Sequence, residues 1–124
     1  MSPAPCRLRI LLVENHEDTL KYLTRYLEIQ GHEVHGTRSM ASAIQALSTS
    51  KFDVLISDIG LPDGDGWQLM RKLDAKPFSI AMSGFGTHSD RQRSLAAGYK
   101  HHLTKPFLPE DLDTILAEAA AQSR

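Results

Sequence analysis

Asp58 is the residue whose position in this sequence most clearly suggests chemistry. It follows the apolar run 54–57 (VLIS) and precedes the segment 59–66, where Pro62 and several glycines are incompatible with a continuing helix. A carboxylate at the end of a strand presents its oxygens at the rim of a sheet, where open α/β sheets bind their ligands. We therefore interpret Asp58 as a reactive aspartate.

Further polar residues stand at the ends of three other predicted strands. Glu14 and Asn15 follow the first strand. Ser83 follows the fourth strand, and Lys105 comes shortly after the fifth. Because the carboxyl ends of parallel strands meet at one edge of a sheet, we expect these side chains to lie near Asp58. Each of these residues alone would be interpreted as a helix cap, a loop hydroxyl or a surface charge. Because all of them fall at the same ends of their strands, we favour a shared functional site.

The residue types of this set suit phosphoryl transfer. Carboxylate and amide oxygens, as offered by Glu14, Asn15 and Asp58, are hard ligands of the kind that Mg²⁺ takes. An aspartate carboxylate can act as a nucleophile towards a phosphoryl group. The charge on the transferred oxygens then needs cationic and hydrogen-bonding partners, which a divalent ion, Lys105 and the Ser83 hydroxyl would provide.

The elements that must position these residues alternate along the chain. Short apolar runs predict strands at 8–13, 33–37, 52–57, 78–82 and 100–103. Helical periodicity predicts helices between them and after Pro109, including a third helix at 65–75 and a fourth at 87–97. In the fourth helix we expect only Leu95 and the alanines to pack, because the other residues there are polar or charged. The alternation predicts an α/β fold: a three-layer (βα)5 doubly wound parallel sheet.

Composition supports one domain and argues against several classes of partner. The 124 residues are 41% hydrophobic, with a net charge of -1, and include one cysteine. The balanced charge favours neither nucleic acid nor an anionic membrane, and no apolar run is long enough to span a bilayer. Without a signal-peptide pattern, we expect a cytoplasmic chain. We expect a domain at 7–121, a flexible segment at 1–6 and a tail at 122–124.

With these residues in view, the sequence resembles the receiver domains of two-component response regulators. The resemblance extends from Leu8 to about Ala119. It is carried by Leu12-Val13-Glu14-Asn15, by Asp58 with Leu61-Pro62 and Asp65-Gly66, by Met82-Ser83-Gly84, and by Lys105-Pro106-Phe107. It implies a flavodoxin-like fold with strand order 2-1-3-4-5.

The resemblance also implies roles for the residues that match. Asp58 would accept a phosphoryl group from a histidine kinase or a histidine phosphotransfer protein. The metal ion, Mg²⁺ or Mn²⁺, would be held by Glu14, Asn15, Asp58 and the backbone carbonyl of Gly60. Phosphorylation would switch the face formed by the fourth helix, the fifth strand and the fifth helix.

The remaining roles implied by the resemblance belong to residues around the phosphoryl group. Ser83 and Lys105 would contact it as catalytic residues. Ser83 would act together with His102 in the switch. The Lys105–Pro106 peptide bond is expected to be cis.

Two residues depart from the usual receiver pattern. Asn15 stands where a second carboxylate is usual, so we expect weaker metal binding, which Asn15→Asp would tighten. His102 stands where many members carry Tyr or Phe, which raises the hypothesis of a pH-sensitive switch. His101 and His102 are adjacent on a strand and should point to opposite faces, so they cannot chelate one ion together.

Two alternatives remain open at this level. A pseudo-receiver would keep the fold as an interaction module without phosphorylation, and Asn15 is the residue that favours it. A small phosphohydrolase with an aspartate nucleophile is the other alternative, although no segment supplies a cap. We expect a monomer or weak dimer that is not a turnover enzyme. Segments 83–86 (SGFG) and 102–106 (HLTKP) look most like receivers at the C-terminus of hybrid sensor histidine kinases.

Overall fold

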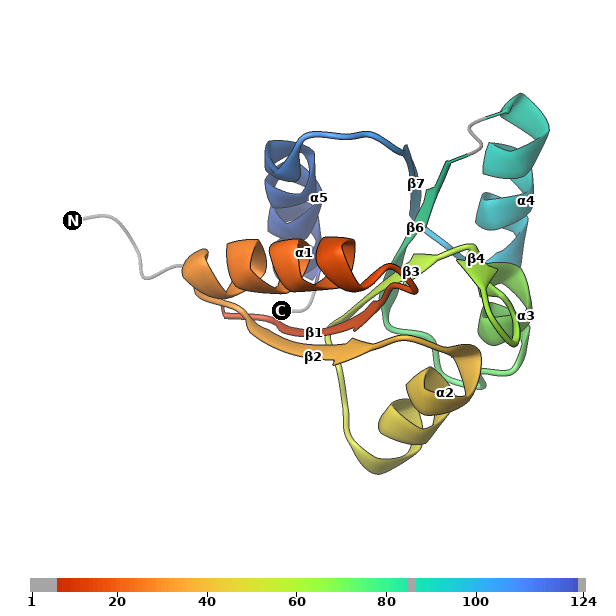
Figure 1. Ribbon diagram of the computed structural model, residues 1–124, viewed down its shortest axis with the longest axis horizontal. Helices are drawn as coiled ribbons and strands as arrows, with labels where there is room; N and C mark the ends of the chain where they lie inside the picture. Colours follow the sequence, from red (N-terminus) through yellow and green to blue (C-terminus); the bar gives the residue numbers. More distant parts are fainter. Residues whose placement is uncertain (1–6, 85–86, 123–124) are drawn as a thin grey trace.

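The computed structural model describes residues 7–84 and 87–122, in which strands and helices alternate (Figure 1). The strands of the main sheet are β1 (Arg9–Val13), β2 (Glu33–Thr37), β3 (Val54–Asp58), β6 (Phe78–Ser83) and β7 (His101–Thr104). The helices are α1 (Glu17–Ile29), α2 (Met40–Thr49), α3 (Gly66–Arg71), α4 (His88–Ala97) and α5 (Pro109–Gln122). A small antiparallel pair, β4 (Gly60–Leu61) and β5 (Gly64–Asp65), lies between β3 and α3.

The main sheet has five parallel strands in the order β2-β1-β3-β6-β7. Since β6 and β7 are its fourth and fifth strands along the chain, this is the predicted order 2-1-3-4-5. The chain leaves β1 towards β2 and later returns to place β3 on the other side of β1. The carboxyl ends of β1 and β3 therefore border the crevice where such sheets bind ligands.

Helices cover both faces of the sheet, which gives the three predicted layers (Figure 1). On one face, Leu23 and Leu27 of α1 and Leu112 and Leu116 of α5 pack against the sheet. On the other face, α2, α3 and α4 close a second apolar cluster that includes Leu11, Leu55, Leu69 and Met70. Because strands buried on both faces cannot alternate apolar and polar residues, β1 and β3 read as near-continuous apolar runs.

The helix ends follow local sequence signals. Ser39 accepts a hydrogen bond from the Ser42 backbone N–H at the start of α2, as its position before the apolar periodicity indicates. Asp65 and Gln68 form a reciprocal capping box at the start of α3. Gly98 ends α4 in the left-handed region with φ 118°, a conformation that favours glycine.

The third helix is shorter than the sequence analysis predicts, and the third strand is displaced. α3 ends at Arg71 rather than at Ala75. Asp74 is a poor helix former, and Lys76 precedes Pro77, which disfavours helical backbone at that position. β3 runs to Asp58 itself, so the reactive carboxylate is the last residue of the strand.

The expectation for the packing of α4 was right for Ala97, which packs against the second apolar cluster, but wrong for Leu95. Leu95 is 55% exposed, whereas Ser94 is completely buried. The buried position tolerates a serine because its hydroxyl has hydrogen-bond partners in α3 and β7. A hydrophobicity pattern alone could not identify that face of the helix.

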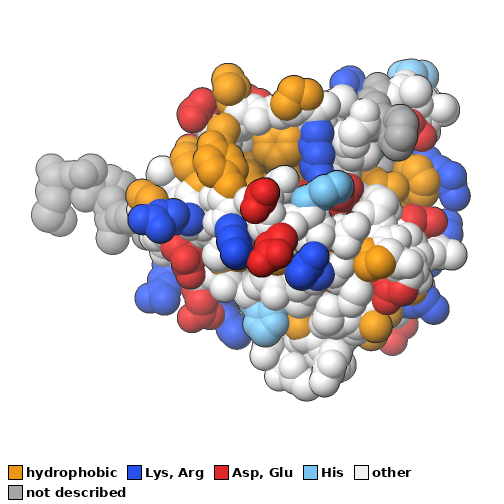
Figure 2. All heavy atoms as spheres, in the orientation of Figure 1, with side chains coloured by type: hydrophobic (Ala, Val, Ile, Leu, Met, Phe, Trp, Pro, Cys, Tyr) orange, Lys and Arg blue, Asp and Glu red, His pale blue; other side chains and the backbone are white. Residues whose placement is uncertain are grey.

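The predicted terminal segments lie mostly outside the described residues. Of the segments 1–6 and 122–124, only Gln122 is described, and it is the last residue of α5. Among the described residues, none of the helices has the length and apolarity that crossing a membrane requires. The face drawn in Figure 2 carries acidic and basic side chains interspersed, in keeping with the net charge of -1.

Candidate functional site

The predicted polar residues meet at the carboxyl edge of the sheet. Glu14 directly follows β1, Asp58 ends β3, and Ser83 ends β6. Lys105 directly follows β7. These four strands stand side by side in the sheet in the order β1-β3-β6-β7, so their ends bring side chains that are distant in sequence to one edge.

Lys105 bridges the two buried carboxylates. Its Nζ lies 2.6 Å from Glu14 Oε1 and 3.1 Å from Asp58 Oδ2. Glu14 is completely buried and Asp58 is 6% exposed. Two carboxylates at this depth would repel each other strongly without a shared cation, because little water screens their charges. Lys105 is therefore the group that allows both acids to remain ionised next to each other.

The pKa values of the three groups reflect this arrangement. Burial raises the pKa of Glu14, but the hydrogen bonds from Lys105 and from the His16 backbone outweigh it, so its pKa lies below the ordinary value. Burial also has the largest effect on the pKa of Asp58, which it raises. The charge of Lys105 lowers this pKa and the charge of Glu14 raises it, and the net result is a raised pKa for Asp58. Burial lowers the pKa of Lys105, yet both carboxylates together raise it above its ordinary value.

The second oxygen of each carboxylate has a different partner. Glu14 Oε2 accepts the backbone N–H of His16 at 3.0 Å, and the His16 ring Nδ1 lies 3.4 Å from the same oxygen. Asp58 Oδ1 accepts the Gly60 backbone N–H at 3.3 Å. Ligand atoms of Glu14, His16 and Asp58 all lie within 4.8 Å of one another, and this acidic group could hold a metal ion. The donor set fits a divalent cation, since two carboxylates converge on it.

The structure brings some predicted metal ligands together more clearly than others. Glu14 and Asp58 converge as expected. Asn15 lies beside them, and its backbone carbonyl accepts a hydrogen bond of 3.3 Å from Arg38. Gly60 contacts Asp58 through its N–H, so metal ligation by its carbonyl stays a prediction. His16 also belongs to this group, and its only signal in the sequence is its place two positions after Glu14.

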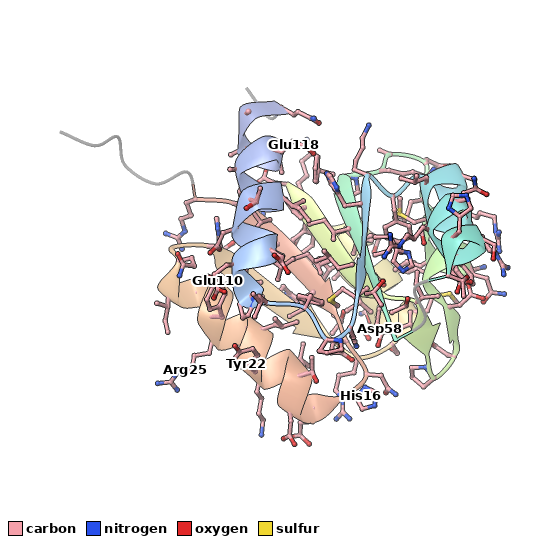
Figure 3. All side chains as sticks on the ribbon, turned by 90° about the horizontal axis from the view of Figure 1, so that it is seen from above. His16, Tyr22, Arg25, Asp58, Glu110 and Glu118 are labelled. Carbon is pink, nitrogen blue, oxygen red and sulfur yellow. The ribbon has the colours of Figure 1, made fainter. Side chains whose placement is uncertain are left out.

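A cavity of about 490 Å³ opens onto Asp58. Its lining includes His16, Asp58, Trp67, Ser83 and Lys105. Figure 3 shows His16 and Asp58 at the same end of the sheet. The cavity can admit a phosphoryl group and part of a donor molecule next to the Asp58 carboxylate.

A chain of hydrogen bonds links Ser83 to α4 and α3. Ser83 Oγ lies 2.8 Å from His102 Nε2, and His102 Nδ1 lies 2.7 Å from Ser94 Oγ. Trp67 Nε1 donates to Ser94 Oγ at 3.0 Å. Because an indole can only donate, Ser94 can use its own hydrogen towards Nδ1, which leaves Nε2–H to donate to Ser83. The guanidinium of Arg93 lies over the Trp67 ring, 3.9 Å from its centroid.

The two adjacent histidines of β7 do point to opposite faces. His101 Nε2 lies 2.7 Å from Glu118 Oε2 of α5, whereas His102 faces α4. The alternation predicted for a strand is confirmed by these partners. Ser94 and Trp67 are the residues of this hydrogen-bonded chain that sequence reasoning missed, because neither matches a chemical motif.

Close backbone packing holds the loop after Asp58 in place. A Cβ on Gly66 would lie 2.9 Å from the Asp58 carbonyl oxygen and 3.0 Å from the Tyr99 hydroxyl. That hydroxyl donates to the Gly66 carbonyl at 2.7 Å. Asp63 caps the start of α2, where it accepts the backbone N–H groups of residues 40 and 41. The Lys105–Pro106 peptide bond, on the other side of the site, is cis.

Comparison with known proteins identifies the family and the fold. Residues 10–117 match the model of the response regulator receiver domain. A two-component response regulator from Clostridium difficile superposes with a TM-score of 0.91 at 23% identity, over 95% of this chain and 99% of that one. A CheY-like receiver domain protein from Methanospirillum hungatei JF-1 superposes with a TM-score of 0.86 at 27% identity, over 94% and 96% of the two chains.

Curated relatives include longer proteins of two kinds. The sensor protein EvgS of Escherichia coli K12 is 29% identical over 117 residues, which are 92% of this chain and 10% of EvgS. The KDP operon transcriptional regulatory protein KdpE of the same strain is 35% identical over 101 residues, or 79% of this chain and 44% of KdpE. The chain therefore spans about a tenth of one relative and less than half of the other.

Proposed function

Because the chain belongs to the response regulator receiver family, we propose that Asp58 accepts a phosphoryl group from a phosphohistidine in a two-component phosphorelay. The observation that carries this proposal is the position of Asp58 at the floor of an open cavity, with Lys105 in contact with its carboxylate. Ionisation of Asp58 next to Glu14 depends on that lysine. The arrangement supplies a nucleophile and a cation at one point.

The proposed reaction requires little more than positioning and charge. A carboxylate oxygen of Asp58 attacks phosphorus, the bond between phosphorus and the donor imidazole nitrogen breaks, and the imidazole leaves with the electron pair. Lys105 Nζ, already 3.1 Å from Asp58 Oδ2, stabilises the negative charge on the transferred oxygens. Mg²⁺ or Mn²⁺, when bound beside Glu14 and Asp58, neutralises further charge on these oxygens. The role of Asn15 and of the Gly60 carbonyl in holding the ion is part of this proposal.

The switch is proposed to start at Ser83. Its oxygen accepts a hydrogen bond from His102 Nε2–H in the present structure, and a phosphoryl group on Asp58 would offer a charged acceptor to the serine O–H. Charge-assisted hydrogen bonds are about twice as strong as neutral ones, so the serine side chain would turn towards Asp58 and give up its contact with His102. His102 would then rearrange with Ser94 of α4 and Trp67 of α3. The face formed by α4, β7 and α5 would carry the signal outwards.

The partner is proposed to be a histidine kinase or a histidine phosphotransfer protein. A groove of about 430 Å³ runs beside the site between α1 and the segment after β7. It is lined by Tyr22, Pro106 and Phe107, and it reaches Lys105. Tyr22 is 58% exposed and nearby Leu108 is 63% exposed, so apolar surface is available beside this groove. A helix carrying the donor histidine could pack there and present its ring to the cavity.

The wider context is proposed from the relatives alone. Similarity to a segment of EvgS supports a receiver that works with a sensor kinase, and similarity to KdpE supports one that works with a transcriptional output. The proposal places the chain in the cytoplasm, where ATP-dependent kinases form phosphohistidine. It acts stoichiometrically rather than as a turnover enzyme. A monomer or weak dimer is sufficient for these steps.

Incubation with acetyl phosphate and Mg²⁺ tests the proposed function. We expect the intact mass to increase by one phosphoryl group, and we expect no increase for Asp58→Asn or in the presence of EDTA. Continuous release of phosphate without an accumulating adduct would indicate an aspartate-nucleophile phosphohydrolase. No reaction at all, in a protein shown to be folded, would indicate a pseudo-receiver and would overturn the proposal.

A further inference from the structure

The side chain of His16 is turned towards the carboxylate of Glu14, although nothing in the sequence requires this orientation. His16 Nδ1 lies 3.4 Å from Glu14 Oε2, although the ring is 75% exposed and could extend into solvent. The same carboxylate oxygen already accepts the His16 backbone N–H at 3.0 Å. One nitrogen of the imidazole therefore faces the site, while most of the ring lies in solvent.

Nδ1 of His16 lies on the side of the Glu14 and Asp58 carboxylates that Lys105 does not contact. Lys105 contacts Glu14 Oε1 and Asp58 Oδ2. The other two oxygens, Glu14 Oε2 and Asp58 Oδ1, face His16 and the loop at Gly60. The cavity that His16, Asp58 and Gly60 line gives a cation access to this side of the site while Lys105 keeps its contacts.

The separation between His16 Nδ1 and Glu14 Oε2 is compatible with two ligands of one ion. Two donor atoms bound at about 2.1 Å from a tetrahedral or octahedral metal lie about 3.0–3.5 Å from each other. The separation of 3.4 Å between His16 Nδ1 and Glu14 Oε2 falls in this range. The ligand atom of Asp58 lies within 4.8 Å of both, so a small movement of an exposed ring and a loop completes the set.

We infer that His16 is a nitrogen ligand of the metal site and makes it select first-row transition-metal ions over Mg²⁺. The inference rests on the proposed metal-dependent function of the same site. Imidazole suits ions such as Co²⁺, Ni²⁺ and Zn²⁺, whereas Mg²⁺ takes oxygen ligands and retains its waters. Asn15 contributes no negative charge, so the site attracts every divalent cation less strongly than a site with a third carboxylate would. A neutral nitrogen donor compensates for this only with the softer ions.

Direct binding measurements on the full chain, without a histidine tag, test the inference. Co²⁺ binding is followed by its visible absorption, and Mg²⁺ binding is measured separately by isothermal titration calorimetry. The variant is His16→Phe, which keeps a ring and removes the ligating nitrogen. The matched control is His35→Phe, because His35 is an exposed histidine on β2, away from the site.

We expect His16→Phe to weaken Co²⁺ binding by about tenfold or more and to alter the absorption spectrum, while Mg²⁺ binding stays the same. His35→Phe should match the unmodified protein in both. An unchanged Co²⁺ affinity and spectrum in His16→Phe would overturn the inference, and so would an equal loss for both metals.

Phosphorylation by acetyl phosphate and Mg²⁺ separates this failure from a failure of the proposed function. If Asp58 is labelled in the unmodified protein while His16→Phe binds Co²⁺ as tightly as the unmodified protein does, only the inference fails. If the unmodified protein binds neither metal and is not labelled, both fail. Labelling that persists in His16→Phe, with Co²⁺ binding lost, supports both, because the histidine is then a ligand that Mg²⁺ does not need.

Discussion

Removing the lysine between the two carboxylates should destabilise the fold measurably. Lys105→Met keeps most of the side-chain volume but leaves Glu14, which is completely buried, and Asp58, which is 6% exposed, without their shared cation. Breaking a buried ion pair by removing one partner costs about 3–5 kcal/mol. Because the Lys105 side chain is 23% exposed, water weakens the interaction. We expect a loss of about 2–3 kcal/mol.

The size of this loss should depend on pH in a defined direction. The pKa of Glu14 lies below its ordinary value of 4.5, so its stabilising contribution is present above that value and is lost as the pH falls. The pKa of Lys105 lies above its ordinary value of 10.5, so its contribution is lost only as the pH rises past the folded value. The difference between the two proteins should therefore be largest at neutral pH and smaller at pH 4.

Urea unfolding in EDTA at pH 7 and pH 4 measures these free energies. The double variant with Asp58→Asn should recover about 1 kcal/mol, because one buried charge is removed together with the lysine. Lys51→Met, at an exposed lysine, should change stability by less than about 0.5 kcal/mol. The reasoning would be refuted by a Lys105→Met protein as stable as the parent at pH 7, or by a difference that grows towards pH 4.

Three other predictions concern the metal, the loop and the switch. Asn15→Asp should tighten Mg²⁺ binding by roughly tenfold, seen in the Mg²⁺ dependence of phosphorylation; an unchanged curve would contradict the proposed role of Asn15. Gly66→Ala should lower the unfolding free energy by about 1–3 kcal/mol, measured in urea, because its Cβ would clash with the Asp58 backbone. Phosphorylation should change the fluorescence of Trp67, the only tryptophan, and His102→Phe should abolish most of that change; an equal response in both proteins would show that the hydrogen-bonded chain does not transmit the switch.

Much of the architecture could be predicted because its signals are local. The apolar runs of β1 and β3 reflect burial on both faces, and Ser39 and Gly98 mark helix ends by chemistry that acts within a few residues. The convergence of Glu14 and Asp58 followed from parallel topology alone. Such features need no knowledge of side-chain packing.

The parts that the sequence did not predict depend on tertiary contacts. Ser94 is buried in place of Leu95 because α4 meets α3 and β7 through polar groups, which hydrophobicity cannot indicate. The facing of His16 towards Glu14 depends on how the loop before α1 turns. The end of α3 at Arg71, earlier than predicted, likewise depends on the tertiary structure around the helix.

Location of the phosphoryl group within the chain tests the central claim most directly. Protein treated with acetyl phosphate and Mg²⁺ is reduced with borohydride, which converts an aspartyl phosphate to homoserine, and peptides are then sequenced by mass spectrometry. The account predicts homoserine at position 58 and no other modified residue. Modification of another residue, or an unmodified Asp58 in folded protein, would contradict it.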